Sequence, residues 1–292
     1  MTDVVVVGSV NYDLGLRVQR LPWAGETVLS SSLTRRSGGK GANQAVAVRE
    51  AGVPCAMVGV VGADGAALVA QLVAAGVDVT RIRADPDATT GTAVIMIDDD
   101  GQNSIIVSSG ANDALTAAEV REAIVESGAR TVLTQGESPV EAITAAAEAA
   151  ESASLRFVLN LAPAIDVPRH VIAVADPLVV NELEAEETAL ALGVGSDRLS
   201  GPDLAETLAE VARSVVITLG AGGAVWAARG EGGRAHAQRV EVVDTTGAGD
   251  AFVGAMVARL TRGDDLAAAV GSGVSAGTRT VQFAGARAAE AR

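Results

Sequence analysis

The stretch from Val242 to Phe252 has the composition of an anion-binding turn followed by a buried helix. A short apolar run leads into Asp244, Thr245, Thr246, Gly247, Ala248, Gly249 and Asp250, and an apolar segment follows. Glycines that open a helix leave backbone N–H groups unpaired at the positive end of the helix dipole, where an anion can bind. Because Asp250 lies in the first turn beside that position, the stretch suits proton removal coupled to transfer of a charged group. An ordinary capped helix explains these residues equally well at this point.

A second candidate site is the glycine-rich loop Gly38, Gly39, Lys40, Gly41, Ala42, Asn43, which leads into a predicted helix over residues 44–50. It is not a Walker A loop, because that motif needs Ser or Thr after the lysine, where Gly41 stands. Glycines let the backbone approach a ligand, and Lys40 and Asn43 supply donors and an acceptor, which suits a polyhydroxyl ligand. Lys40 is the only lysine beside 21 arginines, which favours a specific role. A solvated surface lysine is the alternative.

Three shorter segments are further candidates for a ligand site. Asn11 and Asp13 follow the Val-rich strand Val4–Val7, and open α/β sheets bind ligands at the carboxyl ends of their strands. Asn181 and Glu184, three residues apart at a predicted helix start, fit either a capping box or a site on one side of the helix. Either a plain hairpin turn or a ligand loop is expected at the segment Thr218, Leu219, Gly220, Ala221, Gly222 and Gly223.

Composition excludes several other classes of function. The formal net charge of −14, with no basic cluster longer than Arg35 and Arg36, argues against nucleic acid or an anionic membrane as a partner. With Cys55 as the only cysteine, and with His170 and His236 lacking neighbouring partners, we expect no internal disulfide, histidine-ligated zinc site or Ser-His-Asp triad. No apolar run approaches the ~20 residues of a membrane span, and no signal-peptide pattern is present. We therefore expect a soluble cytoplasmic protein.

The elements that must position these residues alternate between strands and helices. A core rich in Val, Ala, Leu and Ile, with only 2% aromatic residues, predicts parallel strands covered by helices. Two hairpins, at about residues 13–36 and 91–108, have no helix between their strands and are expected to form a small sheet that acts as a lid over the ligand edge. A strand near residues 239–243 and helices over residues 251–260 and Leu266–Thr280 are predicted at the end of the chain. We expect a single domain over residues 1–292.

Five segments in this order resemble the ribokinase-like (PfkB) family of carbohydrate kinases. They are residues 8–13, 25–27, 38–44, 181–184 and 244–252, and the resemblance extends over nearly the whole chain. It implies an α/β fold: a three-layer α/β/α sandwich with a mostly parallel sheet and a small β-sheet lid. It also implies transfer of the γ-phosphoryl group of ATP to a sugar hydroxymethyl group, with O5 of D-ribose as the favoured acceptor.

The resemblance assigns roles to individual residues. Asp250 matches the general base of the family. The anion hole for the transferring phosphoryl group is matched by Gly247, Ala248 and Gly249. The positions that match the sugar site, together with Asp250, are Asn11, Asp13, Gly39, Lys40, Asn43 and Glu137. The positions that match the nucleotide site are Asn181, Thr218, Leu219, Gly220, Ala221, Gly222, Gly223 and Gly249.

The resemblance further implies two cations and a partner. Glu184 matches the acid that organises Mg²⁺, and a monovalent-cation site, suited to K⁺, matches Asp244, Thr246, Thr280, Phe283 and Gly285. A homodimer through the β lid is implied as well. Two positions depart from the family pattern: Gly136 stands where a larger apolar residue is expected beside the sugar, and Ala289 stands near the place of a hydroxyl ligand to the cation.

The acceptor and the activity each have an alternative. Within the class of kinases the acceptor could be another pentose, 2-deoxyribose, fructose or a nucleoside. Asp13, Lys40 and Asn43 favour a free pentose, because the base of a nucleoside would need an apolar or aromatic cleft. Outside that class the chain could be a non-catalytic sugar-sensing protein. The presence of Asp250 together with the two glycines beside it argues against this alternative.

Overall fold

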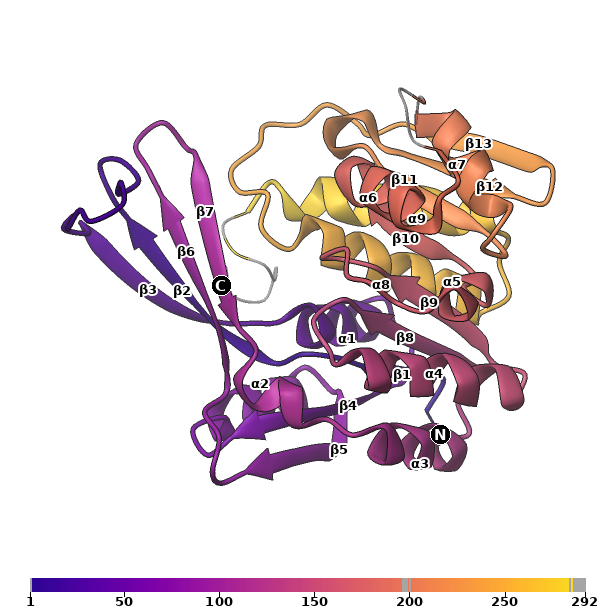
Figure 1. The fold of residues 1–292 in the computed structure, drawn as a ribbon, viewed down its shortest axis with the longest axis horizontal. Coiled ribbons are helices and arrows are strands. Elements are labelled where there is room, and N and C mark those ends of the chain that lie inside the picture. Colours follow the sequence, from indigo (N-terminus) through magenta and orange to yellow (C-terminus); the bar gives the residue numbers. More distant parts are fainter. Residues whose placement is uncertain (1, 196–198, 200, 284, 286–292) are drawn as a thin grey trace.

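The protein is built on a nine-stranded sheet (Figure 1). The computed structural model describes residues 2–195, 199, 201–283 and 285. The strands of this sheet are β1 (Val4–Val7), β4 (Cys55–Gly62), β5 (Asp78–Asp85), β8 (Thr131–Gln135), β9 (Arg156–Asn160), β10 (Leu178–Asn181), β11 (Val215–Thr218), β12 (Ala224–Ala228) and β13 (Glu231–Ala235). Their order is β13-β12-β11-β10-β9-β8-β1-β4-β5, with all neighbours parallel from β11 to β5 and with β12 and β13 antiparallel.

Helices cover both faces of this sheet. One face carries α1 (Lys40–Glu50), α2 (Ala66–Ala74), α8 (Ala248–Thr261) and α9 (Leu266–Thr280), and the other carries α3 (Ala117–Ser127), α4 (Val140–Ser152), α5 (Arg169–Ala173), α6 (Glu182–Leu192) and α7 (Gly201–Ala209). Short 3₁₀ helices lie at η1 (Gly110–Ala114) and η2 (Gly220–Gly222). The predicted three-layer α/β/α sandwich is confirmed.

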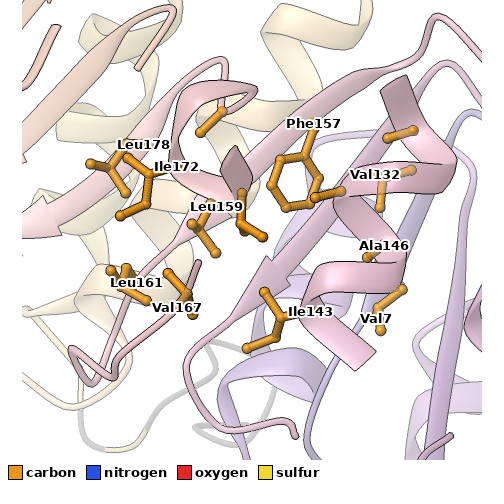
Figure 2. Close-up of a cluster of buried hydrophobic side chains, with 14 of the residues drawn as sticks. Val7, Val132, Ile143, Ala146, Phe157, Leu159, Leu161, Val167, Ile172 and Leu178 are labelled. Carbon is orange, nitrogen blue, oxygen red and sulfur yellow. The ribbon is translucent and has the colours of Figure 1, made fainter. Parts of the chain in front are cut away.

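The sheet separates two hydrophobic cores because successive side chains of a strand point to opposite faces. In β1, Val5 and Val7 belong to the core shared with α3–α7, whereas Val4 and Val6 belong to the core shared with α1, α2, α8 and α9. Figure 2 shows the first of these cores, in which the ring of Phe157 lies among aliphatic side chains from the sheet and its helices. Because both faces of such a strand are buried, its sequence is a continuous apolar run.

A four-stranded sheet stands apart from these layers (Figure 1). It contains β2 (Asn11–Arg17), β3 (Ser32–Gly38), β6 (Gly91–Ile97) and β7 (Asn103–Ser108), in the order β3-β2-β6-β7. The two predicted hairpins are present as the antiparallel pairs β2–β3 and β6–β7, and they join through parallel pairing of β2 with β6. The small sheet is thus assembled from segments about eighty residues apart in sequence.

Two sequence predictions of secondary structure were wrong. Residues 239–243 do not form a strand, and the last strand of the large sheet is β13. Val243 donates its N–H to the carbonyl oxygen of Val281 at 2.8 Å, so the turn after α9 holds this apolar run. Val243 itself is 61% exposed. The helices at the two glycine loops also begin earlier than predicted, at Lys40 and Ala248, because Gly39 and Gly247 serve as their N-cap residues.

The order of the strands directs the candidate residues to one edge. From β1 the chain proceeds to β4 and β5 on one side and later to β8, β9, β10 and β11 on the other. The carboxyl ends of parallel strands on either side of such a reversal border a crevice in which open α/β sheets bind ligands. Residues that follow β1, β8, β10 and β11 therefore lie along a common edge. In the described part of the chain, no helix is long and apolar enough to cross a membrane.

Candidate active site

Asp250 lies in the first turn of α8, at the positive end of the helix dipole. Its side chain is 9% exposed. Both carboxylate oxygens accept hydrogen bonds from α1: Asn43 Nδ2 donates to Oδ2 at 3.0 Å, and Gln44 Nε2 donates to Oδ1 at 2.9 Å. Hydrogen bonds donated to a carboxylate favour its charged form. Asp250 is therefore fixed in direction by two neutral donors.

These hydrogen bonds depend on the close approach of α1 and α8. A Cβ atom added to Gly254 would lie 2.4 Å from the Cβ of Ala47, closer than any side chain tolerates. The absence of a side chain at residue 254 lets the two helices come together one turn beyond Asp250. The short amides of Asn43 and Gln44 can reach the carboxylate only at this separation.

Lys40, the first residue of α1, faces a group of carboxylates. Burial lowers the pKa of its ammonium group, but Asp250, Glu137, Glu184 and Asp13 together raise it further than burial lowers it. The net direction is upward from the ordinary value of 10.5, so Lys40 is a cation throughout the neutral range. The acids that surround Lys40 come from four separate segments, which the fold brings to one place. The alternative of a solvated surface lysine is wrong.

A cavity of about 760 Å³ lies between the small sheet and the edge of the large sheet. It brings together most of the residues predicted for the sugar and the chemistry: Asn11, Asp13, Gly39, Lys40, Asn43, Glu137, Gly247 and Asp250. Two residues predicted for the monovalent cation, Asp244 and Thr246, line it as well. The N–H of Ala248, predicted as part of the anion hole, donates to the carbonyl oxygen of Thr245 at 3.2 Å.

Hydrogen bonds orient the polar groups on the cavity wall. Glu137, two residues after β8, accepts from the Ser9 hydroxyl at 2.5 Å and from the backbone N–H of Lys40 at 3.1 Å through Oε2. Asn112 donates from Nδ2 to Asn11 Oδ1 at 2.7 Å, which leaves the amide nitrogen of Asn11 as the donor that this side chain offers. The acid and the amide are therefore held before a ligand arrives.

Gly136 explains one departure from the family pattern. A Cβ atom at this residue would lie 2.1 Å from the carbonyl oxygen of Pro163, and the Gly136 N–H donates to the Ala162 carbonyl oxygen at 3.1 Å. The backbone of residues 162–163 thus fills the space in which a larger apolar side chain was expected. Ala289, the other departure, lies outside the described residues.

The residues predicted for the nucleotide lie beside the cavity and do not line it. Asn181 ends β10 and Thr218 ends β11, and the two residues are partners in the sheet register. Residues 219–223 form the turn of the hairpin between β11 and β12, with η2 inside it. This segment is a hairpin turn, as one interpretation held, and it lies at the same strand edge as the cavity. Its role with a ligand stays a prediction.

Asn181 and Glu184 form the capping box at the start of α6. Asn181 Oδ1 accepts from the Glu184 N–H, and Glu184 Oε2 accepts from the Asn181 N–H, both at 2.8 Å. Burial nevertheless raises the pKa of Glu184, against the lowering effects of the Asn181 N–H and of Lys40. A partly buried carboxylate with an unbalanced charge fits a hydrated Mg²⁺, which takes one or two carboxylates together with phosphate oxygens. Among the described residues, no cluster of three metal-binding side chains is present.

The segments predicted for a monovalent cation meet at Asp244. Its Oδ1 accepts from the Thr246 N–H and its Oδ2 from the Gly285 N–H, both at 2.9 Å. Burial raises the pKa of Asp244, but these hydrogen bonds and the charge of Arg36 lower it further, so the net direction is downward. The backbone of Thr280 and Phe283 lies in the same turn, where the Phe283 N–H donates to the Thr280 carbonyl oxygen at 3.2 Å. Carboxylate and carbonyl oxygens are a suitable donor set for a hard cation such as K⁺.

Sequence reasoning missed several residues of this site. Gln44, Gln135 and Asn160 form a buried chain of amides that ends on Asp250. Arg36 lines the cavity from β3, opposite Asp13 in the sheet register. The signal for Gln135 and Asn160 was available, since each is an amide residue at the carboxyl end of a buried strand, at the ligand edge. Nothing in the sequence paired them with Gln44.

Comparisons with known proteins agree with this geometry. A model of the pfkB family carbohydrate kinases matches residues 1–292. The chain belongs to this family. A ribokinase of Staphylococcus aureus (strain COL) is 36% identical over 294 residues, which cover 98% of this chain and 95% of that protein.

Two solved structures show the same fold over nearly the whole chain. A ribokinase from Thermotoga maritima aligns with a TM-score of 0.88 and 30% identity, covering 98% of this chain and 95% of that one. A ribokinase from Arabidopsis thaliana, solved with ribose and ATP, aligns with a TM-score of 0.84, 30% identity and the same coverage. The expected ribokinase-like fold and the expected class of enzyme, a carbohydrate kinase, are confirmed.

Proposed function

We propose that this kinase transfers the γ-phosphoryl group of ATP to O5 of D-ribose and releases ribose 5-phosphate and ADP. The observation that carries the proposal is the position of Asp250. It lies at the positive end of α8, in the wall of a cavity lined by groups that suit a sugar. A base beside an anion-binding helix start is the arrangement that phosphoryl transfer to a hydroxyl group needs.

Asp250 is the general base in this mechanism. Its carboxylate accepts the proton of the O5 hydroxyl as that oxygen attacks the γ-phosphorus, and the bond from the γ-phosphorus to the β,γ-bridging oxygen breaks as the new bond forms. Gly247, Ala248 and Gly249 would present N–H groups to the charge on the transferring group. Because the Ala248 N–H is engaged by Thr245, we expect the turn to adjust when the phosphoryl group binds.

The sugar is held by residues of three segments. Asn11 and Asp13 approach it from β2, Lys40 and Asn43 from the start of α1 with the backbone of Gly39, and Glu137 from the end of β8. Amide and ammonium groups donate to hydroxyl oxygens, and carboxylates accept from hydroxyl hydrogens. A pentose offers hydroxyls on several sides, which suits donors and acceptors that converge in this way.

The nucleotide is placed along the same strand edge. Residues 218–223 and Asn181 would contact ATP, and Glu184 would hold Mg²⁺ through water. When bound, the ion would neutralise part of the charge on the phosphates. Net negative protein charge makes such local neutralisation necessary, because ATP itself is a polyanion.

A monovalent cation would act on the loop before α8. Asp244, Thr246, Thr280, Phe283 and Gly285 would supply its oxygen ligands, from segments that are already joined by hydrogen bonds. Such an ion would balance the charge of Asp244 and hold residues 244–247 in the shape that presents N–H groups to the phosphoryl group. We therefore expect K⁺ to raise kcat more than it lowers KM.

The small sheet is proposed to act as a lid and as the interface of a homodimer. One of its faces lines the cavity through residues such as Thr34, Ile95 and Ile105. Alternation along the strands places Leu33 and Ile106 on the other face, where they are 65% and 61% exposed. Leu33 lies on β3 and Ile106 on β7, the two edge strands, and large exposed apolar side chains of this kind favour contact with a second surface.

A direct assay of ADP release tests the proposed activity. We expect D-ribose to give the highest kcat/KM among ribose, 2-deoxyribose, fructose and adenosine, with Mg²⁺ present. Chromatographic measurement of ADP, which needs no coupling enzyme, allows K⁺ to be added or withheld. Higher turnover on another sugar would replace ribose as the acceptor, and no turnover on any of them would contradict the kinase activity and favour a sugar-sensing protein.

A further inference from the structure

Gln44 is fully buried between α8 and the ends of β8 and β9. Its Nε2 donates to Asp250 Oδ1 at 2.9 Å and to Asn160 Oδ1 at 2.8 Å, and its Oε1 accepts from Gln135 Nε2 at 2.8 Å. A primary amide has two N–H donors, and these contacts use both. The side chain is therefore fully committed to its three neighbours.

The direction of each amide in this chain follows from the charge of Asp250. An ionised carboxylate only accepts hydrogen bonds, so Gln44 must present its nitrogen to Asp250. Asn160 must then present its oxygen to Gln44, and its own nitrogen donates to the carbonyl oxygen of Val179 at 3.0 Å. Gln135 must present its nitrogen to the oxygen of Gln44. Each orientation follows from the one before it, and the whole chain requires an acceptor at Asp250. At the far end of the chain, Gln135 Oε1 is buried and has no hydrogen-bond partner among the described residues.

The two oxygens of Asp250 differ in what surrounds them. Oδ1 faces Gln44, which is 0% exposed, whereas Oδ2 faces Asn43, which lines the cavity. A ligand in the cavity can compete for Asn43 but cannot reach Gln44. The bond from Gln44 therefore stays in place while the sugar binds and reacts.

We infer that Gln44 is a positioning residue, which directs the carboxylate of Asp250 so that Oδ2 takes the proton of the sugar hydroxyl, and that Gln135 and Asn160 hold Gln44 in turn. The inference rests on the proposed role of Asp250 as the base. None of the three buried amides touches the substrate. Each of them affects the reaction only through the orientation of Asp250. Neutral donors suit this task because they favour the carboxylate without adding a charge to the site.

The charged groups around Asp250 cannot replace these amides. Lys40 on α1 is the cation that interacts with Asp250, and it interacts as well with Glu137 after β8, Asp13 on β2 and Glu184 at the start of α6. Its charge is thus divided among four carboxylates. Lys40 attracts Asp250 but gives it no fixed direction, whereas the bond from Gln44 gives one.

The test replaces Gln44 with methionine, which has a similar length and shape and no donor. We expect Gln44→Met to lower kcat about 10- to 100-fold, the effect of losing one hydrogen bond to a charged group. The KM for ribose should stay within about threefold, because Gln44 does not line the cavity.

A matched control on the same helix separates this effect from a loss of packing. Val46 is buried in the core beneath α1 and belongs to no part of the site, so Val46→Ala removes two methyl groups without changing a hydrogen bond. We expect its kcat to stay within about threefold of the wild type. Equal losses of kcat in the two variants would overturn the inference, as would a Gln44→Met enzyme with unchanged kcat.

A second variant keeps the inference testable if Gln44→Met does not fold. Gln135→Met removes the donor to Gln44 Oε1 and leaves the bond from Gln44 to Asp250 in place. We expect a smaller loss of kcat than in Gln44→Met, with the KM for ribose within about threefold of the wild type. A Gln135→Met enzyme with unchanged kcat would overturn the inference.

Asp250→Asn, measured in the same series, separates this inference from the proposed function. An inactive Asp250→Asn together with a fully active Gln44→Met would overturn the positioning role alone. An active Asp250→Asn would remove Asp250 from the role of base, and the role of Gln44 would fall with it.

Discussion

Lys40 is the residue on which the charges of the site converge. Four carboxylates raise the pKa of its ammonium group although burial lowers it, so the net direction is upward and Lys40 stays a cation. Charges of both signs line the cavity. The acids are Asp13, Glu137, Asp244 and Asp250, and the bases are Arg17, Arg36 and Lys40.

At this scale we predict that Lys40→Ala raises the KM for ribose about 10- to 100-fold, because a charged donor to sugar hydroxyls is lost. The kcat at saturating ribose should fall less, since Asp250 and its donors remain. Steady-state kinetics with ribose varied at saturating ATP measures both values. A KM that stays at the wild-type value would show that Lys40 does not contact the sugar.

The raised pKa of Lys40 also predicts a pH dependence of stability. A base whose pKa is higher in the folded state than in the unfolded state contributes stability that is fully present below the unfolded value. That contribution is lost as the pH rises through the folded value. Urea unfolding of the wild type between pH 9 and 12 should show a decline that begins near the ordinary value of 10.5 and is smaller in Lys40→Ala. Identical declines would contradict the charge coupling of Lys40.

Glu184 offers a test of the metal site that leaves the helix intact. Glutamine fits the capping box as glutamate does, so Glu184→Gln should keep the cap of α6 and remove only the charge. Because burial raises the pKa of Glu184, the loss of charge should leave the melting temperature at pH 7 without Mg²⁺ unchanged or slightly higher. The Mg²⁺ concentration for half-maximal activity should rise about 10- to 100-fold. An unchanged Mg²⁺ dependence would contradict the assignment.

At the scale of elements, the contact between α1 and α8 determines whether Asp250 has its donors. Gly254→Ala should force the two helices apart, lower the free energy of unfolding by about 1–3 kcal/mol and lower kcat as the bonds from Asn43 and Gln44 lengthen. Gly271→Ala on α9 is the matched control. A Cβ there meets no atom within 4 Å, so this change should stabilise the protein by about 0.5–1 kcal/mol and leave kcat unchanged. Urea unfolding and steady-state kinetics measure both variants, and equal kcat values would contradict the link between helix spacing and catalysis.

Sequence reasoning worked best where a local pattern determines a local structure. The Val-rich β1, the capping residues of α6 and the hairpins of the small sheet follow from periodicity and turn residues, and the structure contains each of them. It failed at residues 239–243, which have the apolar composition of a strand and are held in place by Val281 after α9. No local pattern reports a partner that lies about forty residues away.

The candidate site divides in the same way. The motifs around Lys40 and Asp250 predicted that each lies at a helix start, and the structure places both in one cavity. The network of Gln44, Gln135 and Asn160 was not predicted. Its members lie in three separate segments, and only the packing of α1 and α8 against the strand ends brings them together.

At the scale of the whole molecule, the small sheet is where a second chain would bind. Ile106→Lys places a charge among the exposed apolar residues of the outward face and should convert a dimer to a monomer. Leu190→Lys, at a 73% exposed residue of α6, a helix that covers the large sheet, should leave the assembly unchanged. Light scattering after size-exclusion chromatography measures the mass. A monomeric wild type, or a dimer that persists in Ile106→Lys, would contradict the proposed interface.

The central claim is that the γ-phosphoryl group of ATP moves to O5 of D-ribose, and identification of the product by nuclear magnetic resonance tests it most directly. The enzyme is incubated with ATP, Mg²⁺ and ¹³C-labelled ribose, and the ³¹P and ¹³C spectra are recorded as ADP forms. The account predicts one sugar phosphate, equal in amount to the ADP released, whose phosphorus couples to C5. A phosphorus coupled to another ring carbon, or ADP formed without any sugar phosphate, would contradict the account.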